Sequence, residues 1–192
     1  MDSAICLDIE IKWLCGFIMC DYENAWDTLS EIDITFLAAT AYLPQQDVWR
    51  SFKKDDAGEL CALVAEATNV ITFNGKKWDL PFLGKFAATL SARAKLQSLC
   101  QKVTSNSHDD IYQIATEIAG NQSIKRYHLA RLNFGSKAMD EWRLGSEQYQ
   151  SKLVKEGWEN VLAFQASKAW EDVSTTYALW SLWRENKLQT KD

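Results

Sequence analysis

Two carboxylates interrupt an apolar, β-prone segment near the start of the chain. Asp8 and Glu10 are the acids of the run Ala-Ile-Cys-Leu-Asp-Ile-Glu-Ile over residues 4–11. Because successive side chains of a strand point to opposite faces, both acids share one face, about 7 Å apart along the strand. Burying two neighbouring acids is costly unless cations lie between them. The pair therefore predicts a strand that either holds a divalent ion such as Mg²⁺ or presents a solvated polar face at a sheet edge.

The pattern of apolar residues predicts strands first and helices later. Strands are expected over 4–11, 14–20, part of 25–42, and 69–73. Helices are expected over 55–67, 81–90, 110–119 and 158–186. Asp79 is the expected N-cap of the second helix. This order favours an α/β fold, a mixed β-sheet flanked by α-helices, in one domain over residues 1–192. The absence of a glycine-rich loop after the first strand disfavours a doubly wound dinucleotide-binding fold.

Composition narrows the class of protein. Five cysteines without Cys-x-x-Cys spacing, together with only two histidines, disfavour a zinc site. Cys6, Cys20 and Cys61 lie in apolar surroundings, so we expect buried thiols and a reducing, cytoplasmic compartment. We expect no signal peptide and no membrane span, because no segment has the required character or length. The net charge of −5 disfavours a general nucleic-acid coat protein, but it suits an enzyme whose carboxylates hold cations.

Two further acidic positions follow the first pair. The buried strand over 69–73 ends at Asn74-Gly75, a strong turn signal, and Asp79 follows closely. Asp172 lies in the run Trp-Glu-Asp-Val of the final helix. Acids in such apolar segments are best explained by shared cations. We therefore predict that Asp8, Glu10, Asp79 and Asp172 converge on one pocket.

Taken in order, these motifs resemble those of the DEDD family of 3′–5′ exonucleases, which have an RNase H-like fold. That family carries Asp-x-Glu on its first strand, Asn-x₂₋₃-Phe/Tyr-Asp after a later strand, and its last Asp on a C-terminal helix. Residues 70–83 resemble the second motif, with Trp78 in place of Phe or Tyr. Residues 108–111, 127–137 and 172–180 resemble the family's His-x-Asp-Leu segment, its Leu-Ala helix and its Asp-Val-x-x-Thr ending.

The resemblance implies hydrolysis of phosphodiester bonds in DNA or RNA from a 3′ end, with a single strand as the expected substrate and two Mg²⁺ or Mn²⁺ ions as cofactors. Asp8, Glu10 and Asp172 would ligate the metal that activates water, and Asp8 would bridge to the second metal. Asp79 would hold that second metal mainly through waters. The expected contacts to the terminal nucleotide and its phosphate are Ile9, Asn74, Gly75, Lys76 and Trp78.

The chain departs from the family at the general base. Relatives carry a Tyr four residues before the last Asp, or a His five residues before it; Lys168 and Ser167 stand there in this chain. Because Lys168 and Asp172 are four residues apart on a helix, they face the same side. Lys168 could pair structurally with Asp172 or Glu171, act as a base, or take the metal's place in an inactive protein. Since carboxylates and metal favour its charged form, we expect Lys168 to position water or the scissile phosphate as a cation.

Other functions stay open beside the exonuclease. The missing base favours a catalytically impaired nucleic-acid-binding or protein-interaction module on the same fold, whereas the four retained acids favour the enzyme. A metal-dependent nuclease that cuts internally is a third possibility. Some motif residues also have plain structural interpretations: Lys76 as part of a solvated turn, His108 as a surface residue before a helix, and Asp109 and Asp110 as caps of that helix.

Overall fold

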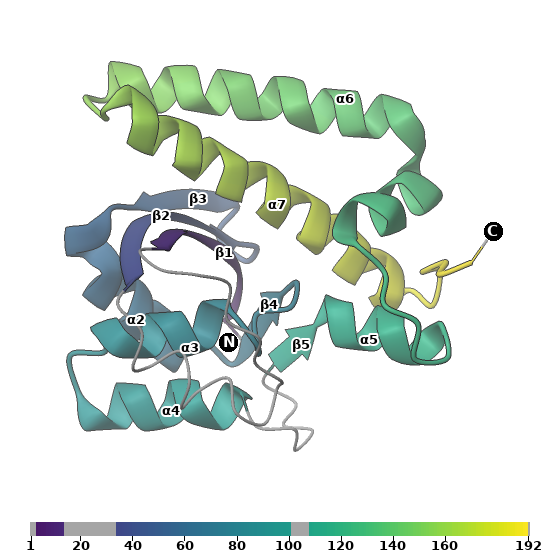
Figure 1. Ribbon diagram of the computed structural model, residues 1–192, viewed down its shortest axis with the longest axis horizontal. Coiled ribbons are helices and arrows are strands. Elements are labelled where there is room, and N and C mark those ends of the chain that lie inside the picture. Colours follow the sequence, from purple (N-terminus) through teal and green to yellow (C-terminus); the bar gives the residue numbers. More distant parts are fainter. Residues whose placement is uncertain (1–2, 14–33, 101–107, 192) are drawn as a thin grey trace.

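A five-stranded mixed sheet forms the centre of the computed structural model, which describes residues 3–13, 34–100 and 108–191 (Figure 1). The strands are β1 (Ala4–Trp13), β2 (Ile34–Leu43), β3 (Val48–Phe52), β4 (Asn69–Thr72) and β5 (His108–Asp110). They are ordered β3-β2-β1-β4-β5. The first three pair antiparallel, whereas β4 runs parallel to β1 and β5 runs parallel to β4. The expected mixed sheet is therefore confirmed.

Three of the predicted strands are found in the sheet. β1, β2 and β4 confirm the strands expected over 4–11, within 25–42, and over 69–73. The strand expected over 14–20 lies outside the described residues. The sequence pattern does not predict β3, whose five residues Val-Trp-Arg-Ser-Phe follow no clean alternation. It does not predict β5 either, because His-Asp-Asp is a polar sequence that becomes a strand only by pairing with β4.

The helices fill most of the second half of the chain. They are α2 (Ala57–Glu66), α3 (Asp79–Leu83), α4 (Leu90–Cys100), α5 (Ile111–Ile118), α6 (Arg126–Lys155) and α7 (Asn160–Arg184). Helices expected over 55–67, 110–119 and 158–186 are confirmed, but the one expected over 81–90 ends as an α-helix at Leu83. Asp79 is not an N-cap, since Trp78 holds that position and Asp79 begins the helix. Among helices in the described ranges, none has the length and apolar character of a membrane span.

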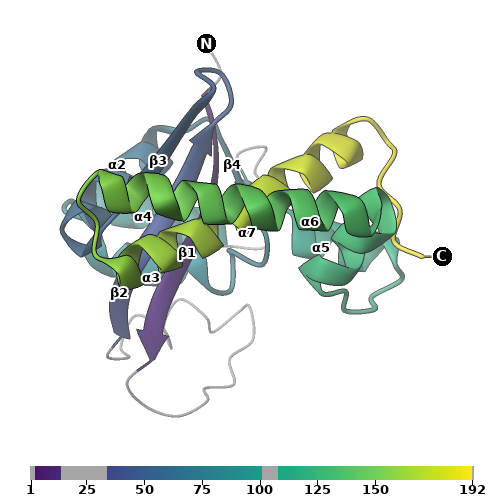
Figure 2. The same cartoon turned by 90° about the horizontal axis from the view of Figure 1, so that it is seen from above.

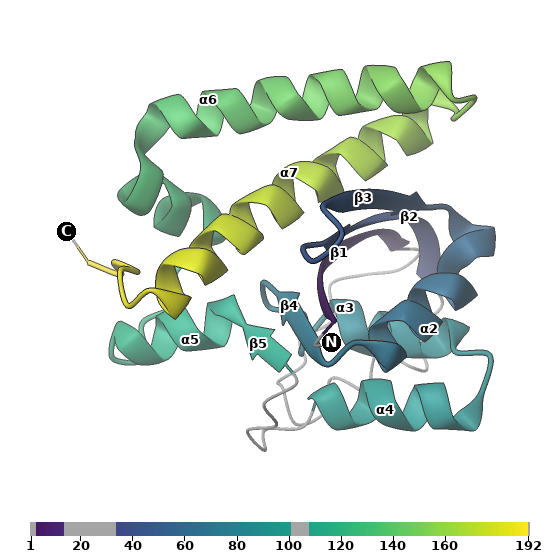
Figure 3. The same ribbon diagram turned by 180° about the vertical axis from the view of Figure 1, so that it is seen from behind.

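Helices cover both faces of the sheet (Figures 1 and 3). On one face, Ile5 and Leu7 of β1 belong to a buried cluster with apolar residues of α2, α3 and α4. On the other face, Cys6 belongs to a cluster with residues of α5, α6 and α7. Because side chains alternate along a strand, Asp8 and Glu10 belong to the face that α7 covers. The order of residues in β1 thus places both acids under α7.

α6 packs along the outer side of α7 (Figure 2) and is interrupted near its start (Figure 1). The interruption is at Gly135, whose φ of 75° and ψ of 176° are not helical. A backbone with positive φ of this kind is accessible to glycine at little cost and strained for other residues. The break separates the short segment that begins at Arg126 from the long segment along α7. Arg126 can therefore lie beside β1 while the rest of α6 follows α7.

Candidate metal centre

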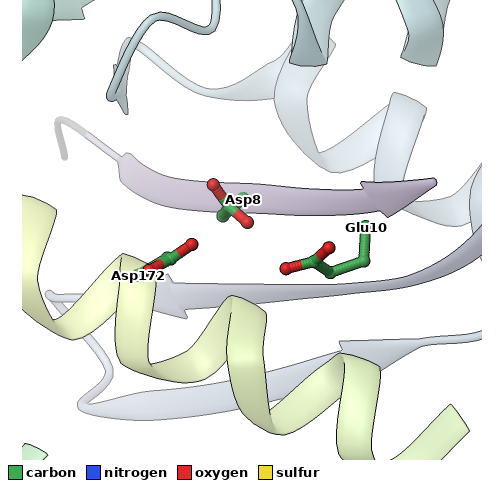
Figure 4. A group of neighbouring side chains, drawn as sticks. All are labelled: Asp8, Glu10 and Asp172. Carbon is green, nitrogen blue, oxygen red and sulfur yellow. The ribbon is translucent and has the colours of Figure 1, made fainter. Parts of the chain in front are cut away.

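Three of the predicted acids meet between β1 and α7 (Figure 4). One carboxylate oxygen from each of Asp8, Glu10 and Asp172 lies within 4.8 Å of the other two. All three residues are half-buried. Carboxylate oxygens at this spacing are ligands that a hard divalent cation accepts. The structure therefore brings Asp172 of α7 together with Asp8 and Glu10 of β1, which lie more than 160 positions earlier in the sequence, in a group that could hold a metal ion.

The position of α7 over β1 is fixed by contacts on both sides of the acids. Thr40 of β2, which pairs with Asp8, donates its hydroxyl to the Ala166 carbonyl of α7 at 2.9 Å. The Cys6 thiol donates to the Val173 carbonyl, with Sγ and O 3.7 Å apart. These two bonds hold α7 at Ala166, nearly two turns before Asp172, and at Val173, directly after it. The carboxylate of Asp172 is therefore directed at β1 by the packing of the helix.

Asp79 approaches the same part of β1 from α3. Its Oδ1 accepts a hydrogen bond from the backbone N–H of Ile9 at 2.9 Å. The parallel pairing of β1 with β4 ends at Cys6, so this N–H beyond the ladder is available to the side chain. Burial raises the pKa of Asp79 to about 7, against the opposing effect of the Ile9 hydrogen bond. Asp79, the fourth predicted acid, thus lies beside Asp8 and is hydrogen-bonded to Ile9, the residue between Asp8 and Glu10.

Burial and mutual electrostatic repulsion raise the pKa values of the acids. Burial, and then the charges of Asp172 and Asp79, raise the pKa of Asp8 well above its usual range. Burial and the charge of Asp172 likewise raise the pKa of Glu10. Burial raises the pKa of Asp172 as well, although Arg126 opposes the shift. Clustered buried carboxylates of this kind favour either protons or cations between them.

Arg126 supplies such a cation, and none of the sequence motifs predicts it. Its Nη1 lies 3.3 Å from Asp8 Oδ1, and its Nη2 forms an ion pair with Asp172 Oδ2. The guanidinium carbon lies 5.5 Å from the centre of the Phe73 ring. Arg126 directly precedes the segment 127–137 that resembles a family motif. A single arginine at a helix start carries no periodic or spacing signal, so only the folded structure reveals its role.

A cavity of about 370 Å³ opens beside Asp8 and Asp79. Three aromatic side chains, the turn after β4 and the start of α6 surround it. Its lining residues are Asp8, Ile9, Phe73, Asn74, Trp78, Asp79, Tyr112, Ser123, Ile124, Lys125 and Arg126. Four predicted substrate or metal contacts, Ile9, Asn74, Trp78 and Asp79, therefore share one cavity with Asp8. Gly75 and Lys76, two other predicted contacts, do not line it.

The turn that carries Asn74 is held by Asp110. Asp110 Oδ1 accepts from the backbone N–H of Asn74 at 2.8 Å, and its Oδ2 accepts from that of Lys76 at 3.0 Å. Oδ1 also accepts from Tyr112 N, so Asp110 caps α5 as predicted. Asp109 does not cap the helix, because its carboxylate accepts from Asn69 and from the Trp180 indole. Asp110 thus supports the cavity wall from outside the metal site.

Lys76 and His108 lie in the interior behind this turn. The interpretation of Lys76 as a solvated residue is wrong, because it is only 9% exposed. His108 is not a surface residue either, because it is only 7% exposed. Its Nδ1 lies 3.0 Å from the Leu99 carbonyl oxygen. Burial lowers the pKa of His108 to about 4, so the ring is neutral near pH 7.

A chain of hydrogen bonds runs from His108 to the turn. Since a carbonyl only accepts, His108 Nδ1–H donates to Leu99, which leaves Nε2 to accept from Thr72 Oγ1 at 2.8 Å. Thr72 Oγ1 in turn accepts from the backbone N–H of Gly75 at 3.2 Å. A Cβ at position 75 would lie 2.4 Å from Thr72 Oγ1, so only glycine fits. The absence of a side chain at Gly75 therefore allows its backbone to approach the Thr72 side chain closely.

Lys168 lies on the exposed side of α7, one turn before Asp172. Its Nζ is 5.7 Å from the centre of the Phe164 ring. No ion pair joins it to Asp172 or Glu171, both of which belong to the described part of the chain, so a structural ion pair is not its role here. Its positive charge lowers the pKa of Glu10 and Asp172, as a secondary influence beside burial. Lys168 therefore acts on the acids through space and is free to contact a ligand at the rim.

Comparison with known proteins assigns no family to this arrangement. No protein-family model matches the chain, and no curated protein matches it. The basis for a function is therefore the geometry of the acids, Arg126 and the adjoining cavity, together with the order of the motifs in the sequence.

Proposed function

We propose that this protein is a divalent-metal-dependent 3′–5′ exonuclease with an RNase H-like fold. The observation that carries the proposal is the meeting of Asp8, Glu10 and Asp172 within 4.8 Å, with Asp79 bound to the intervening Ile9. The five-stranded mixed sheet with helices on both faces is compatible with that fold. The mutual repulsion of these acids opposes folding, and Arg126 forms ion pairs with only two of them, Asp8 and Asp172. A ligand that requires four carboxylates explains their presence.

The residues fit divalent cations. The donors are all carboxylate oxygens, which suit Mg²⁺ or Mn²⁺ rather than softer metals. The guanidinium of Arg126 already binds two of the acids, which indicates that the site favours positive charge. Asp8, Glu10 and Asp172 would hold one ion, and Asp8 with Asp79 would hold a second. When bound, such ions supply an activated water and neutralise the charge that develops in phosphodiester hydrolysis.

The cavity beside the acids suits the terminal nucleotide of a nucleic acid. Trp78, Phe73 and Tyr112 offer flat apolar faces on which an unpaired base can stack. Asn74 stands at the same wall, in a left-handed conformation with φ of 66°. A duplex end would have to open before its last base could enter a pocket of about 370 Å³. A single-stranded 3′ end is therefore the proposed substrate.

Lys168 takes the position where the resembling family has its base. Its amine is exposed one turn before Asp172, and its positive charge acts on Glu10 and Asp172. Lys168 orients water or the scissile phosphate by this charge rather than removing a proton. His108 does not serve as the base, because both its ring nitrogens are engaged in the interior.

A catalytically impaired nucleic-acid-binding module is the second candidate. The observation that favours it is Arg126, which occupies two of the carboxylates that a metal would need. A permanently bound guanidinium would keep the fold and the cavity while excluding metal. Such a protein would bind single strands without cutting them.

The deciding experiment uses single-stranded DNA and RNA labelled at the 5′ end, incubated with Mg²⁺, Mn²⁺ or EDTA. The proposal expects products that shorten one nucleotide at a time in the presence of metal only. Asp8→Asn serves as the inactive control, because it removes the ligand common to both ions. Internal fragments at early times would instead indicate an endonuclease. Strands that stay intact with either metal, but migrate more slowly through a gel because the protein is bound, would support the binding module.

A further inference from the structure

Several contacts hold the Arg126 side chain in place, unlike that of a loose surface ion pair. Its side chain is 22% exposed, and it bridges carboxylates from β1 and α7. The Phe73 ring lies against the guanidinium, and the break at Gly135 directs the start of α6 toward the site. The guanidinium thus has three separate contacts that define its place. It stands between two acids to which the proposed function assigns a metal.

We propose that Arg126 is an exchangeable cation of this site, bound to Asp8 and Asp172 without metal and released when a divalent ion binds. The inference rests on the proposed function, because it takes these acids as metal ligands. A dication placed between Asp8 and Asp172 would lie close to the guanidinium that bridges them, and like charges at this distance repel strongly. Arg126 and the metal therefore compete for Asp8 and Asp172.

Glu10 makes this competition reversible. One of its oxygens lies within 4.8 Å of both other acids, but the two ion pairs of Arg126 go to Asp8 and Asp172. Three carboxylates and one guanidinium leave the group negatively charged, so it still attracts a cation. A metal can meet Glu10 first and then displace the arginine. Without the metal, Arg126 reduces the electrostatic repulsion that would otherwise push the three carboxylates apart.

The cavity offers a place for the displaced side chain. Arg126 lines it next to Lys125, and Trp78 and Asn74 form another part of the wall. A nucleotide bound there would carry its phosphate toward Asp8 and the metal. Released guanidinium groups bind phosphate oxygens in pairs, which a lysine cannot reproduce. Arg126 would then be a positioning residue for the terminal phosphate in the metal-loaded protein.

The competition is tested by Mn²⁺ affinity in the absence of nucleic acid, measured by calorimetry or by electron paramagnetic resonance. Arg126→Met should lower the dissociation constant for Mn²⁺ on the order of tenfold, because the competitor is gone. Arg131→Met, at an exposed arginine of the same helix, should leave it unchanged. If Arg126 has a purely structural role, Arg126→Met should instead raise the dissociation constant for Mn²⁺, because loss of the arginine would disorder the metal ligands.

The outcomes separate this inference from the proposed function. Equal Mn²⁺ affinity in wild type and Arg126→Met would overturn the exchange while leaving a metal site in place. Binding by Arg126→Met alone would mean that the arginine permanently replaces the metal, which overturns both. No binding by either protein would overturn the proposed function itself.

Two further measurements keep the test decisive if Arg126→Met does not fold. Arg126→Lys should give an intermediate Mn²⁺ affinity, since a point charge cannot bridge both acids. In the wild type, Mg²⁺ should shift the Arg126 side-chain resonances in nuclear magnetic resonance spectra, and an unmoved signal at saturating metal would overturn the exchange. The phosphate contact is tested with Mn²⁺-loaded protein: wild type should bind a nucleoside 5′-monophosphate more tightly than the nucleoside. Arg126→Lys should lose most of that preference; an unchanged preference would remove the phosphate role.

Discussion

Asp79 accepts a hydrogen bond from the backbone N–H of Ile9, at 2.9 Å, although the two residues lie 70 positions apart. Ile9 separates Asp8 from Glu10, so this bond ties α3 to the three residues that present both carboxylates. An aspartate can accept this hydrogen bond whether or not it is protonated. The bond and the charge of Asp79 are therefore separable, and a single substitution distinguishes them.

We expect Asp79→Asn to stabilise the metal-free protein at pH 8, on the order of 2 kcal/mol. The asparagine oxygen can still accept from Ile9, while the charge near Asp8 is removed. Because burial raises the pKa of Asp79 to about 7, its stabilising contribution is complete below about pH 4 and lost as pH rises through 7. Urea unfolding in EDTA measures the free energy of unfolding of both proteins. The value for the variant should equal that of the wild type at pH 4 and exceed it increasingly toward pH 8.

His108 provides an internal check on this experiment. Its pKa is lowered to about 4, so its neutral form stabilises the fold above pH 6.5 and this stability is lost as pH falls. Both proteins contain His108, and its contribution cancels in the difference between them. A difference that stays constant from pH 4 to pH 8 would contradict the assigned role of Asp79.

The sequence predicts the elements that carry the acids but not the contacts that join them. β1, β4 and α7 have strong apolar patterns, and motif order places Asp8 and Glu10 in β1 and Asp172 in α7. The burial of His108 and the ion pairs of Arg126 depend on neighbours distant in sequence, so no local pattern predicts them. The helix expected over 81–90 ends at Leu83, and the chain continues as a 3-10 turn over Gly84–Phe86.

The hydrogen-bond chain behind the Asn74-Gly75 turn gives a second prediction. Thr72→Val keeps the shape of the side chain but removes the hydroxyl shared by His108 and Gly75. We expect it to lower the free energy of unfolding by about 1–3 kcal/mol, because two buried groups lose their partner. Urea unfolding monitored by tryptophan fluorescence measures the change.

Thr116→Val is the matched control for this variant. The Thr116 hydroxyl oxygen is buried and has no hydrogen-bond partner, so replacing it should be neutral or stabilising. Equal losses of stability in both valine variants would show that the hydroxyl of Thr72 has no special role in holding the turn.

Metal should stabilise the folded protein. Because only the folded state brings the carboxylates together, binding of Mn²⁺ adds to the free energy of unfolding, by about 2.7 kcal/mol at a hundred times the Kd. Millimolar Mn²⁺ should therefore raise the Tm. Asp8→Asn should lose most of this gain, since Asp8 is the acid assigned to both ions. Asp140→Asn, at an exposed acid of α6, should keep it. Differential scanning fluorimetry with and without EDTA measures the three proteins, and a Tm unaffected by Mn²⁺ in the wild type would count heavily against a metal site.

Lys168 gives the last prediction, because its place on α7 separates this chain from the family it resembles. Its amine is exposed, acts on Glu10 and Asp172 by charge, and forms no ion pair with Asp172. We expect Lys168→Ala to lower kcat about 10- to 10³-fold, as for loss of a group that stabilises charge. Lys155→Ala, at an exposed lysine ending α6, should be unaffected.

The conservative variant distinguishes a cation from a base at this position. If Lys168 acts by its charge, Lys168→Arg should keep part of the activity, and the profile from pH 6 to pH 9 should change little. If it removes a proton, arginine should be as poor as alanine, since a guanidinium does not deprotonate in proteins. Single-turnover rates on a labelled strand measure these cases. Wild-type rates in Lys168→Ala would mean that the acids and their ions orient the water without help from this lysine.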